Sequence, residues 1–197
     1  MPPTIRLATP DDAEQVQAIY APYCFTPISF ESGPPSVEEM RSRLAKVLVK
    51  YPWLVCEVGG EVLGYAYATQ HRERAAYRWS VDTTVYVRQE RQRRGLGRAL
   101  YTSLLAVLPL QGYVNAYAGV TLPNPASVGL HEAVGFQRVG VYRQVGFKCG
   151  AWYDVAWFQR TLQPRPAEPL PPSRLEEVQQ TAAWLEALNG GRRLLHD

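Results

Sequence analysis

The sequence predicts an α/β domain with a mixed central β-sheet and helices on its faces, followed by a C-terminal helical extension. Along residues 1–162, segments rich in β-branched and aromatic residues alternate with segments that carry apolar residues at helical spacing. The proline-rich stretch that follows, QPRPAEPLPPS, is incompatible with a regular helix or strand and is typical of a linker. We therefore expect a domain over residues 1–162, a linker over 163–173 and a helical tail over 174–197.

The first half of the domain is predicted to contain one strand, two helices and a β-hairpin. The strand is TIRLA, and the helix after it has Thr9 as its N-cap and Pro10 at its first position. The second helix begins at SVEE, where Ser36 and Glu39 match a capping box. The segments WLVCEV and VLGYAYATQ flank the turn residues GGE, as the two strands of a hairpin do.

Strands alternate with helices in the second half of the domain. SVDTTVYV is a predicted strand, residues 97–108 are a predicted helix, and YVNAYAGV is the next strand. ASVGLHEAVG is a predicted helix that Gly135 ends, and two further strands are expected around residues 137–145 and 152–162. This order of elements predicts a mixed sheet between layers of helices.

The tail carries apolar residues at helical spacing, namely Leu175, Val178, Ala182, Leu185 and Leu188. We expect Gly190 and Gly191 to stop this helix. Because an isolated helix of this length is only marginally stable in water, the tail is expected to dock on its own domain or on a partner chain. A disordered tail is the alternative.

Composition and charge exclude several classes of protein. Apolar residues make up 46% and charged residues 20% of the chain, which is the balance of a globular domain and not of a disordered one. A net charge of +3 does not by itself indicate nucleic-acid binding. The segment MPPTIRLATPDD lacks the apolar core of a secretion signal, and no apolar run reaches the roughly 18 residues that span a membrane.

The cysteines and histidines match neither a disulfide framework nor a metal site. Cys24, Cys56 and Cys149 lie far apart and form no CxxC pair, so we expect reduced thiols in a cytoplasmic protein. The histidines at positions 71, 131 and 196 lack the spacing of metal ligands, and no HExxH motif occurs. The sequence therefore predicts no metal.

The stretch RQRRGLGR joins the strand ending in TVYV to a helix, and this arrangement is typical of an anion site. The first N–H groups of a helix have no partner within the helix, and Gly95 and Gly97 allow a bulky oxyanion to approach the backbone. Arginine side chains beside them can add charge-assisted hydrogen bonds. Because Leu100 occupies the place of the third glycine, the stretch fails the dinucleotide pattern GxGxxG, and it also fails the P-loop pattern. A solvated basic turn is the alternative.

The segment RQRRGLGRAL is similar to the Q/R-x-x-G-x-G/A signature of the GNAT N-acetyltransferases, and the similarity extends from about Ile5 to Leu162. More narrowly, the chain resembles the phosphinothricin and methionine sulfoximine N-acetyltransferases in YPWLVCEVGGEVLGYAYA, WSVDTTVYV, TLPNPASVGLHEAVGF and VGFKCGAWYDVAWFQ. The resemblance implies a GNAT fold over residues 1–162 and acetyl-CoA as co-substrate. It also implies acetyl transfer to the amino group of a small amino acid-like compound, by an enzyme that is expected to form a homodimer.

The same resemblance implies the residues that hold the cofactor. The backbone of Val85, Tyr86 and Val87 takes the pantetheine arm in the manner of an added strand. The loop that takes the pyrophosphate consists of Arg93, Arg94, Gly95, Leu96, Gly97 and Arg98. Asn124 and Ser127 are expected on the CoA side of the site.

Two residues are implied as catalytic. Asp82 stands where the family usually has a glutamate; it keeps the carboxylate but is one methylene shorter, so proton removal through one water fits the geometry. An aspartate that only balances a neighbouring arginine is the alternative. His131 also matches a family position, although a lone histidine on a helix is more often a hydrogen-bonded structural residue. Tyr142 and Tyr153 are candidates for protonating the departing thiolate.

The resemblance places the acceptor beside Phe30 and the loop QHRERAAYRW, which supplies Arg72, Arg74 and Tyr77. Guanidinium groups suit an acceptor with a second acidic group, although a solvated charged turn is the alternative. The family often has an arginine after this phenylalanine, and this chain has Glu31. A carboxylate there would repel an anionic acceptor, which argues against phosphinothricin itself.

Three other functions compete with this interpretation. A GNAT enzyme acting on a protein or peptide amine would have an open, acidic groove. A CoA-binding sensor without turnover is favoured by the aspartate at position 82. Nucleic-acid binding through RQERQRR is disfavoured because no aromatic residues are interleaved with the basic ones.

Overall fold

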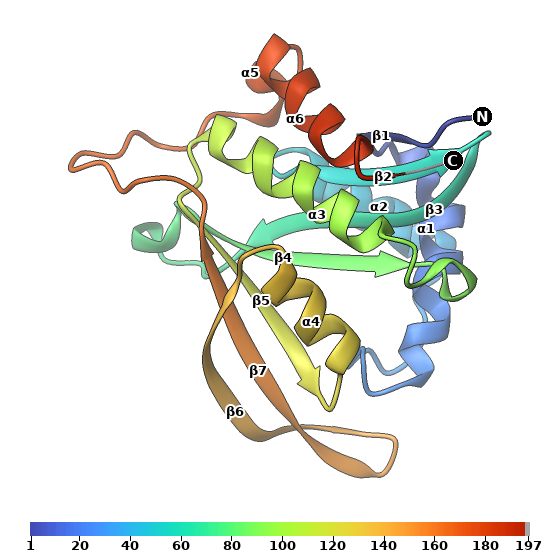
Figure 1. Cartoon of the computed structure of the whole chain (residues 1–197). Helices are drawn as coiled ribbons and strands as arrows, with labels where there is room; N and C mark the ends of the chain where they lie inside the picture. The colour runs from blue at the N-terminus through green and yellow to red at the C-terminus, as the bar shows by residue number, and fades with distance from the viewer. Residues whose placement is uncertain (196–197) are drawn as a thin grey trace.

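The computed structural model describes residues 1–195 and shows a seven-stranded sheet in the order β1-β2-β3-β4-β5-β7-β6 (Figure 1). The strands are β1 (Thr4–Leu7), β2 (Trp53–Val58), β3 (Glu61–Gln70), β4 (Ser80–Val87), β5 (Asn115–Leu122), β6 (Gln137–Lys148) and β7 (Ala151–Thr161). All neighbouring strands are antiparallel except β4 and β5, which are parallel. The predicted mixed sheet is confirmed.

Helices cover both faces of this sheet. The helices are α1 (Ala13–Tyr20), α2 (Val37–Leu48), α3 (Leu96–Val107), α4 (Pro125–Ala133), α5 (Leu175–Val178) and α6 (Ala182–Arg192). Short 3-10 turns span Pro10–Asp12, Ala21–Phe25, Ala75–Tyr77, Gln89–Arg91 and Leu108–Gln111. Because side chains alternate along a strand, β2 contributes Trp53 and Val55 to a core under α1 and α2, and Leu54 and Cys56 to a core under α3.

Local signals set several of these elements. The capping box at the start of α2 forms as predicted: the Glu39 N–H donates to Ser36 Oγ at 3.1 Å, and the Ser36 N–H donates to Glu39 Oε2 at 2.7 Å. Gly135 follows α4 with φ of 86°, the left-handed conformation that favours glycine after a helix. Strand β6 is longer than expected, since it runs to Lys148, whereas β7 begins and ends one residue earlier than expected.

The parallel strands β4 and β5 diverge soon after they begin. Their pairing comprises Ser80 with Asn115, Val81 with Ala116 and Asp82 with Tyr117. Figure 1 shows the two strands opening into a wedge beyond this point. The rest of β4, residues 83–87, therefore has ladder partners on β3 but none on β5. This open side of β4 positions the candidate site.

The tail packs on the domain that precedes it. Helix α6 lies against α3 (Figure 1), where Ser103 Oγ donates to the Leu188 carbonyl at 2.8 Å. The predicted single helix is broken at residues 179–181, because Thr181 caps a new helix and accepts a hydrogen bond from the Trp184 N–H at 3.2 Å. The tail was expected to reach residue 197, and residues 196–197 lie outside the described part of the chain.

The prediction that Gly190 and Gly191 stop the tail helix is wrong, since both lie within α6. A Cβ on Gly191 would lie 2.1 Å from the Ala99 carbonyl oxygen of α3. The glycine therefore permits close packing of two helices, and tertiary contact overrides its weak helix propensity.

Among residues 1–195, no helix combines the length and the apolar character that a membrane crossing requires.

Candidate active site

A carboxylate and an imidazole meet where β4 and β5 separate. Asp82 is the last residue of β4 that pairs with β5, and its partner there is Tyr117. On its other side Asp82 pairs with Thr69 of β3, and His71 follows two residues later on the same face. His71 Nδ1 lies 2.7 Å from Asp82 Oδ1, within hydrogen-bonding distance.

Aromatic rings fix the plane of the His71 imidazole. The imidazole stacks on the Tyr117 ring, with centroids 4.3 Å apart and 14° between the planes. Tyr77 and Trp157 meet it edge-on, at centroid distances of 6.0 and 6.4 Å. Because its side chain is only 10% exposed, the imidazole has a defined place in the site.

Burial raises the pKa of the Asp82 carboxyl above its ordinary value, while the hydrogen bond to His71 and the charges of His71 and Arg72 act in the opposite direction. This carboxylate is therefore more basic than one on an open surface. Its hydrogen-bond partner is a histidine, whereas the alternative interpretation expected an arginine.

Sequence reasoning did not identify His71. Its loop was recognised, but only the arginines and the tyrosine in it were considered. The signal that finds His71 is the register of the hairpin: Thr69 lies opposite Asp82, and alternation then puts the side chain of residue 71 on the same face. That register depends on where the β3–β4 turn closes, which local propensity leaves undetermined.

His131 lies on the opposite face of the sheet from Asp82. It stacks on Phe158, and Phe158 pairs with Ala118, the residue after Tyr117. Successive residues point to opposite faces, so the sheet separates His131 from Asp82.

Both nitrogens of His131 are engaged. Its Nδ1 lies 2.7 Å from the Ser127 carbonyl, to which it donates, and its Nε2 therefore accepts from the Tyr101 hydroxyl at 3.0 Å. The residue is only 3% exposed, and burial lowers the pKa of its imidazole. This histidine is consequently neutral at neutral pH.

The turn before α3 has the backbone geometry of an anion site. Arg93 and Gly95 have φ of 59° and 80°, so the chain turns through two left-handed residues before α3 begins. Gly95 is the N-cap, and the N–H groups that follow it open the helix. The side chains of Arg93, Arg94 and Arg98 are exposed around this turn.

Leu96 and Gly97 have packing roles in the same turn. The Leu96 side chain is 6% exposed and belongs to the core under α3. A Cβ on Gly97 would lie 3.0 Å from Leu130 Cδ2, so this glycine lets α4 approach α3.

Backbone groups of β4 face the open wedge. The Arg88 N–H bonds the Leu63 carbonyl on β3, and backbone groups alternate along a strand, so those of Val85 and Val87 point away from β3. The Val87 carbonyl accepts a hydrogen bond from Tyr23, which leaves Val85 as the open position. The Tyr86 ring lies on the α1 face, where it packs on Tyr20 and Tyr23.

Asn124 and Ser127 form the start of α4. Asn124 is the N-cap, and its Oδ1 accepts the Ser127 N–H at 3.1 Å. The cap fixes both residues at the helix end that follows β5, the second strand of the wedge.

A cavity of about 400 Å³ lies on the α1 face of the wedge. Its lining residues are Tyr20, Ile28, Ser29, Phe30, Glu31, Tyr86, Gly119, Thr121 and Val155. Lys148 holds the loop that carries Phe30, because its Nζ donates to the carbonyls of Cys24 and Glu31. The Phe30 ring lies directly against Gly146 of β6.

The Glu31 carboxylate is paired with Arg43 of α2, at 2.6 Å between Oε1 and Nη1. The expected repulsion of an anionic acceptor by Glu31 is therefore offset by a guanidinium from another element. A second cavity of about 450 Å³, walled by Trp53 and Tyr67 among others, shares Tyr20 and Glu31 with the first.

The β3–β4 loop surrounds His71. The Arg72 Nη1 donates to the His71 carbonyl, and the Arg72 guanidinium lies 5.7 Å from the centroid of the Trp157 ring. Arg74 precedes the turn at Ala75–Tyr77 and is exposed. The structure thus brings Arg72 and Tyr77 next to His71, and it brings Phe30 to the cavity on the α1 face.

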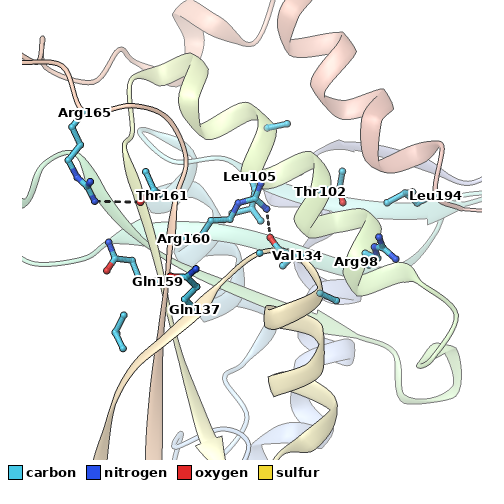
Figure 2. Close-up of a pocket in the computed structure, with 14 residues that line it drawn as sticks. Arg98, Thr102, Leu105, Val134, Gln137, Gln159, Arg160, Thr161, Arg165 and Leu194 are labelled. Carbon is cyan, nitrogen blue, oxygen red and sulfur yellow. Dashed lines mark hydrogen bonds between the residues drawn. The ribbon is translucent and has the colours of Figure 1, made fainter.

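A further cavity, of about 1090 Å³, lies elsewhere. Figure 2 shows it between α3, the end of α4 and the strands β6 and β7, with Arg98, Arg160 and Arg165 on its walls. Arg160 donates to the Val134 carbonyl, the C-cap of α4. Of the residues predicted for the site, only Arg98 reaches this cavity.

No group of three or more His, Cys, Asp or Glu residues within residues 1–195 is arranged to hold a metal ion.

Comparison with known proteins identifies relatives of the whole domain. A family model described as an acetyltransferase (GNAT) domain matches residues 5–157. A phosphinothricin N-acetyltransferase of Streptomyces viridochromogenes is 42% identical over 174 residues, which cover 86% of this chain and 95% of that protein. An L-methionine sulfoximine/L-methionine sulfone acetyltransferase of Pseudomonas paraeruginosa is 38% identical over 120 residues, which cover 60% of this chain and 70% of that protein.

A solved structure has the same fold. It is a GNAT superfamily phosphinothricin acetyltransferase from Sinorhizobium meliloti in complex with acetyl-CoA, with a TM-score of 0.83 and 32% sequence identity. The similarity covers 92% of this chain and 100% of that one.

Proposed function

This chain belongs to the GNAT acetyltransferase family, and we propose that it transfers the acetyl group of acetyl-CoA to the amino group of a small amino acid-like compound. The observation that carries the proposal is the wedge between β4 and β5. An open strand edge, a glycine turn at a helix N-terminus and a basic carboxylate converge on it.

We propose that acetyl-CoA binds along the open edge of β4. The pantetheine amides bond the backbone around Val85, next to Tyr86 and Val87. The pyrophosphate meets the first N–H groups of α3 and the exposed side chains of Arg93, Arg94 and Arg98. Asn124 and Ser127 contact the cofactor from the other side of the wedge.

The reaction requires an uncharged amine next to the thioester carbonyl. The acceptor ammonium loses a proton, its nitrogen forms a bond to the carbonyl carbon, and the C–S bond then breaks. Asp82 takes part in removing the first proton, which it accepts either directly or through one group that lies between it and the amine. His131 acts from the other face by holding Ser127 and Tyr101 in place, because both of its nitrogens are occupied.

The acceptor enters on the α1 face, beside Phe30 and the β3–β4 loop. Arg72, Arg74 and Tyr77 suit an acceptor with a second acidic group, such as the compounds for which the relatives are named. The ion pair of Glu31 with Arg43 keeps this side of the cavity from repelling such an acceptor.

A screen of acceptors tests the proposed function. Thiol release from acetyl-CoA is measured with methionine sulfoximine, methionine sulfone, phosphinothricin, unmodified amino acids and a peptide with a free amine. We expect turnover with at least one amino acid-like compound, and Arg72→Gln should raise the KM of an acidic acceptor more than that of a neutral one. Turnover with the peptide alone contradicts the substrate class. Binding of CoA without thiol release from any acceptor identifies a sensor.

We also propose that the protein is a cytoplasmic homodimer. The free cysteines Cys24, Cys56 and Cys149 support a reducing compartment. Apolar side chains exposed on β6 and β7 support a dimer, and their test is described with the whole molecule below.

A further inference from the structure

The aspartate at position 82 does not face the wedge alone, because the imidazole of His71 is attached to it by a hydrogen bond of 2.7 Å. We propose that His71 is the base that takes the proton from the acceptor amine, and that Asp82 positions it. This inference rests on the proposed acetyl transfer and assigns its proton to a residue of the β3–β4 loop.

The length of the two side chains motivates this assignment. The Asp82 side chain has a single methylene between its backbone and its carboxylate, so the carboxylate stays close to β4. The His71 ring is hydrogen-bonded to that carboxylate, so its second nitrogen is a proton acceptor that lies farther out than the carboxylate.

The hydrogen bond determines which nitrogen of His71 is basic. An ionised carboxylate only accepts, so Nδ1 carries the hydrogen that bonds Asp82 Oδ1. The lone pair then resides on Nε2, for which no hydrogen-bond partner is found among residues 1–195. A base oriented by a hydrogen bond from its far nitrogen to a third group is a recurring catalytic arrangement.

The surroundings of His71 hold its imidazole in a fixed place. Asp82 faces it from β4, Tyr117 from β5, Trp157 from β7, and Tyr77 and Arg72 from the loop. Among these groups Asp82 is the only anion and Arg72 is the only permanent cation. Because the Asp82 side chain is only 28% exposed, solvent screens its contact with the ring less than it would on an open surface.

The proposed step balances. One N–H proton of the acceptor ammonium passes to His71 Nε2, directly or through one water, and the neutral amine attacks the thioester carbon. A C–N bond forms, the C–S bond breaks, and the second amine proton goes to the departing thiolate. The products are the amide, CoA thiol and one proton, which His71 returns to solvent before the next turnover.

Four variants test the pair kinetically: His71→Gln, Asp82→Asn, the two combined, and Asp82→Glu. We expect His71→Gln and Asp82→Asn each to lower kcat by about 10²–10⁴-fold without changing acetyl-CoA affinity. The combined variant should be no slower than the slower single variant, because the two residues act as a unit. Arg78→Gln is the matched control on the same loop, where Arg78 contacts Ala75 and Trp79 instead, and it should leave kcat unchanged.

The pH dependence distinguishes a base from a structural residue. In the wild type kcat/KM should rise with pH as the base loses its proton. His71→Gln should abolish this rise, and added imidazole should restore turnover to His71→Gly at a pH where free imidazole is neutral. If His71→Gln keeps both kcat and the rise while Asp82→Asn loses kcat, Asp82 is itself the base and the inference is overturned.

A measurement that does not depend on turnover distinguishes a failure of this inference from a failure of the proposed function. Nitrogen-15 spectra of the cofactor-free protein at neutral pH should show His71 with a proton on Nδ1 and none on Nε2, and Asp82→Asn should remove that preference. If wild-type His71 instead carries its proton on Nε2 and none on Nδ1, the proposed pairing of His71 with Asp82 is overturned. Wild-type protein that acetylates no acceptor in the screen overturns the proposed function, and the spectra still decide the geometry of the pair.

Discussion

The position of Phe30 depends on the absence of a side chain at Gly146. A Cβ on Gly146 would lie 2.1 Å from Cε2 of the phenylalanine ring, so Gly146→Ala must displace the ring from the cavity proposed for the acceptor. A misplaced acceptor costs rate even where the reacting groups are intact. We expect the acceptor kcat/KM to fall by about tenfold or more, with acetyl-CoA affinity unchanged.

Gly140→Ala is the matched control, because nothing lies within 4 Å of a Cβ at that position of the same strand. Steady-state kinetics of both variants with the best acceptor of the screen check the prediction. Equal kinetics for the two variants would show that Phe30 does not position the acceptor.

His131 is expected to make stability depend on pH. Burial lowers the pKa of its imidazole in the folded protein, so below pH of about 6.5 the unfolded chain binds a proton that the folded chain resists. The contribution of His131 is therefore complete above that pH and is lost as the pH falls toward the lower folded pKa. Melting temperatures between pH 8 and pH 5 should decline for this reason.

His131→Gln should be less stable than the wild type at pH 8 by about 1–3 kcal/mol, because the Tyr101 hydroxyl and the Ser127 carbonyl lose their buried partner. Its melting temperature should also depend less on pH. An unchanged pH dependence would assign the decline to other groups. A loss of kcat in a variant of unaltered stability would instead favour a direct catalytic part for His131.

At the level of elements, the features that could be predicted from the sequence are those that depend on residues close together in the chain. The order of strands and helices, the capping box of Ser36 with Glu39 and the glycine turn at Gly95 each depend on residues a few positions apart. His71 was missed because its meeting with Asp82 needs the register of two strands. Gly191 was misinterpreted because its role lies in contact with a helix about ninety residues earlier in the chain, as shown by Ala99.

The packing of α6 on α3 can be tested with adjacent glycines. Gly191→Ala places a Cβ 2.1 Å from a carbonyl oxygen of α3 and should destabilise the protein by about 1–3 kcal/mol. Gly190→Ala meets nothing within 4 Å in the same helix, and alanine's helix propensity should stabilise it by up to about 1 kcal/mol. Chemical denaturation of both variants checks the prediction, and equal destabilisation by both would mean that α6 does not pack closely on α3.

At the scale of the whole molecule, the sheet separates two halves of the proposed reaction. The glycine turn, α3 and α4 lie on one face, and the cavity with Phe30 lies on the other, under α1. The wedge between β4 and β5 joins the two faces at Asp82. A thioester threaded through the wedge would meet an amine that arrives from the opposite side, so each substrate has its own entrance.

The hairpin of β6 and β7 projects from the body of the molecule (Figure 1) and exposes apolar side chains. These are Val139, Tyr142, Val145, Phe147 and Trp152, each at least half exposed. Large exposed apolar side chains often mark interaction sites, and β6 is also the edge strand of the described sheet, with unpaired backbone groups. We therefore expect the hairpin to be covered by a second copy of this chain.

Sedimentation of the wild type and of two variants tests this expectation. Phe147 and Trp152 form a cross-strand pair with ring centroids 5.3 Å apart, so replacing both with serine removes two large exposed apolar side chains without emptying a core. The wild type should sediment as a dimer at micromolar concentration, and the double variant should shift toward the monomer. Leu185→Ser, which alters an apolar side chain that is 59% exposed on α6, is the control and should remain dimeric. A monomeric wild type contradicts the dimer. A double variant that stays dimeric would place the interface on another face, because the hairpin would then contribute little of the buried area that a stable dimer needs.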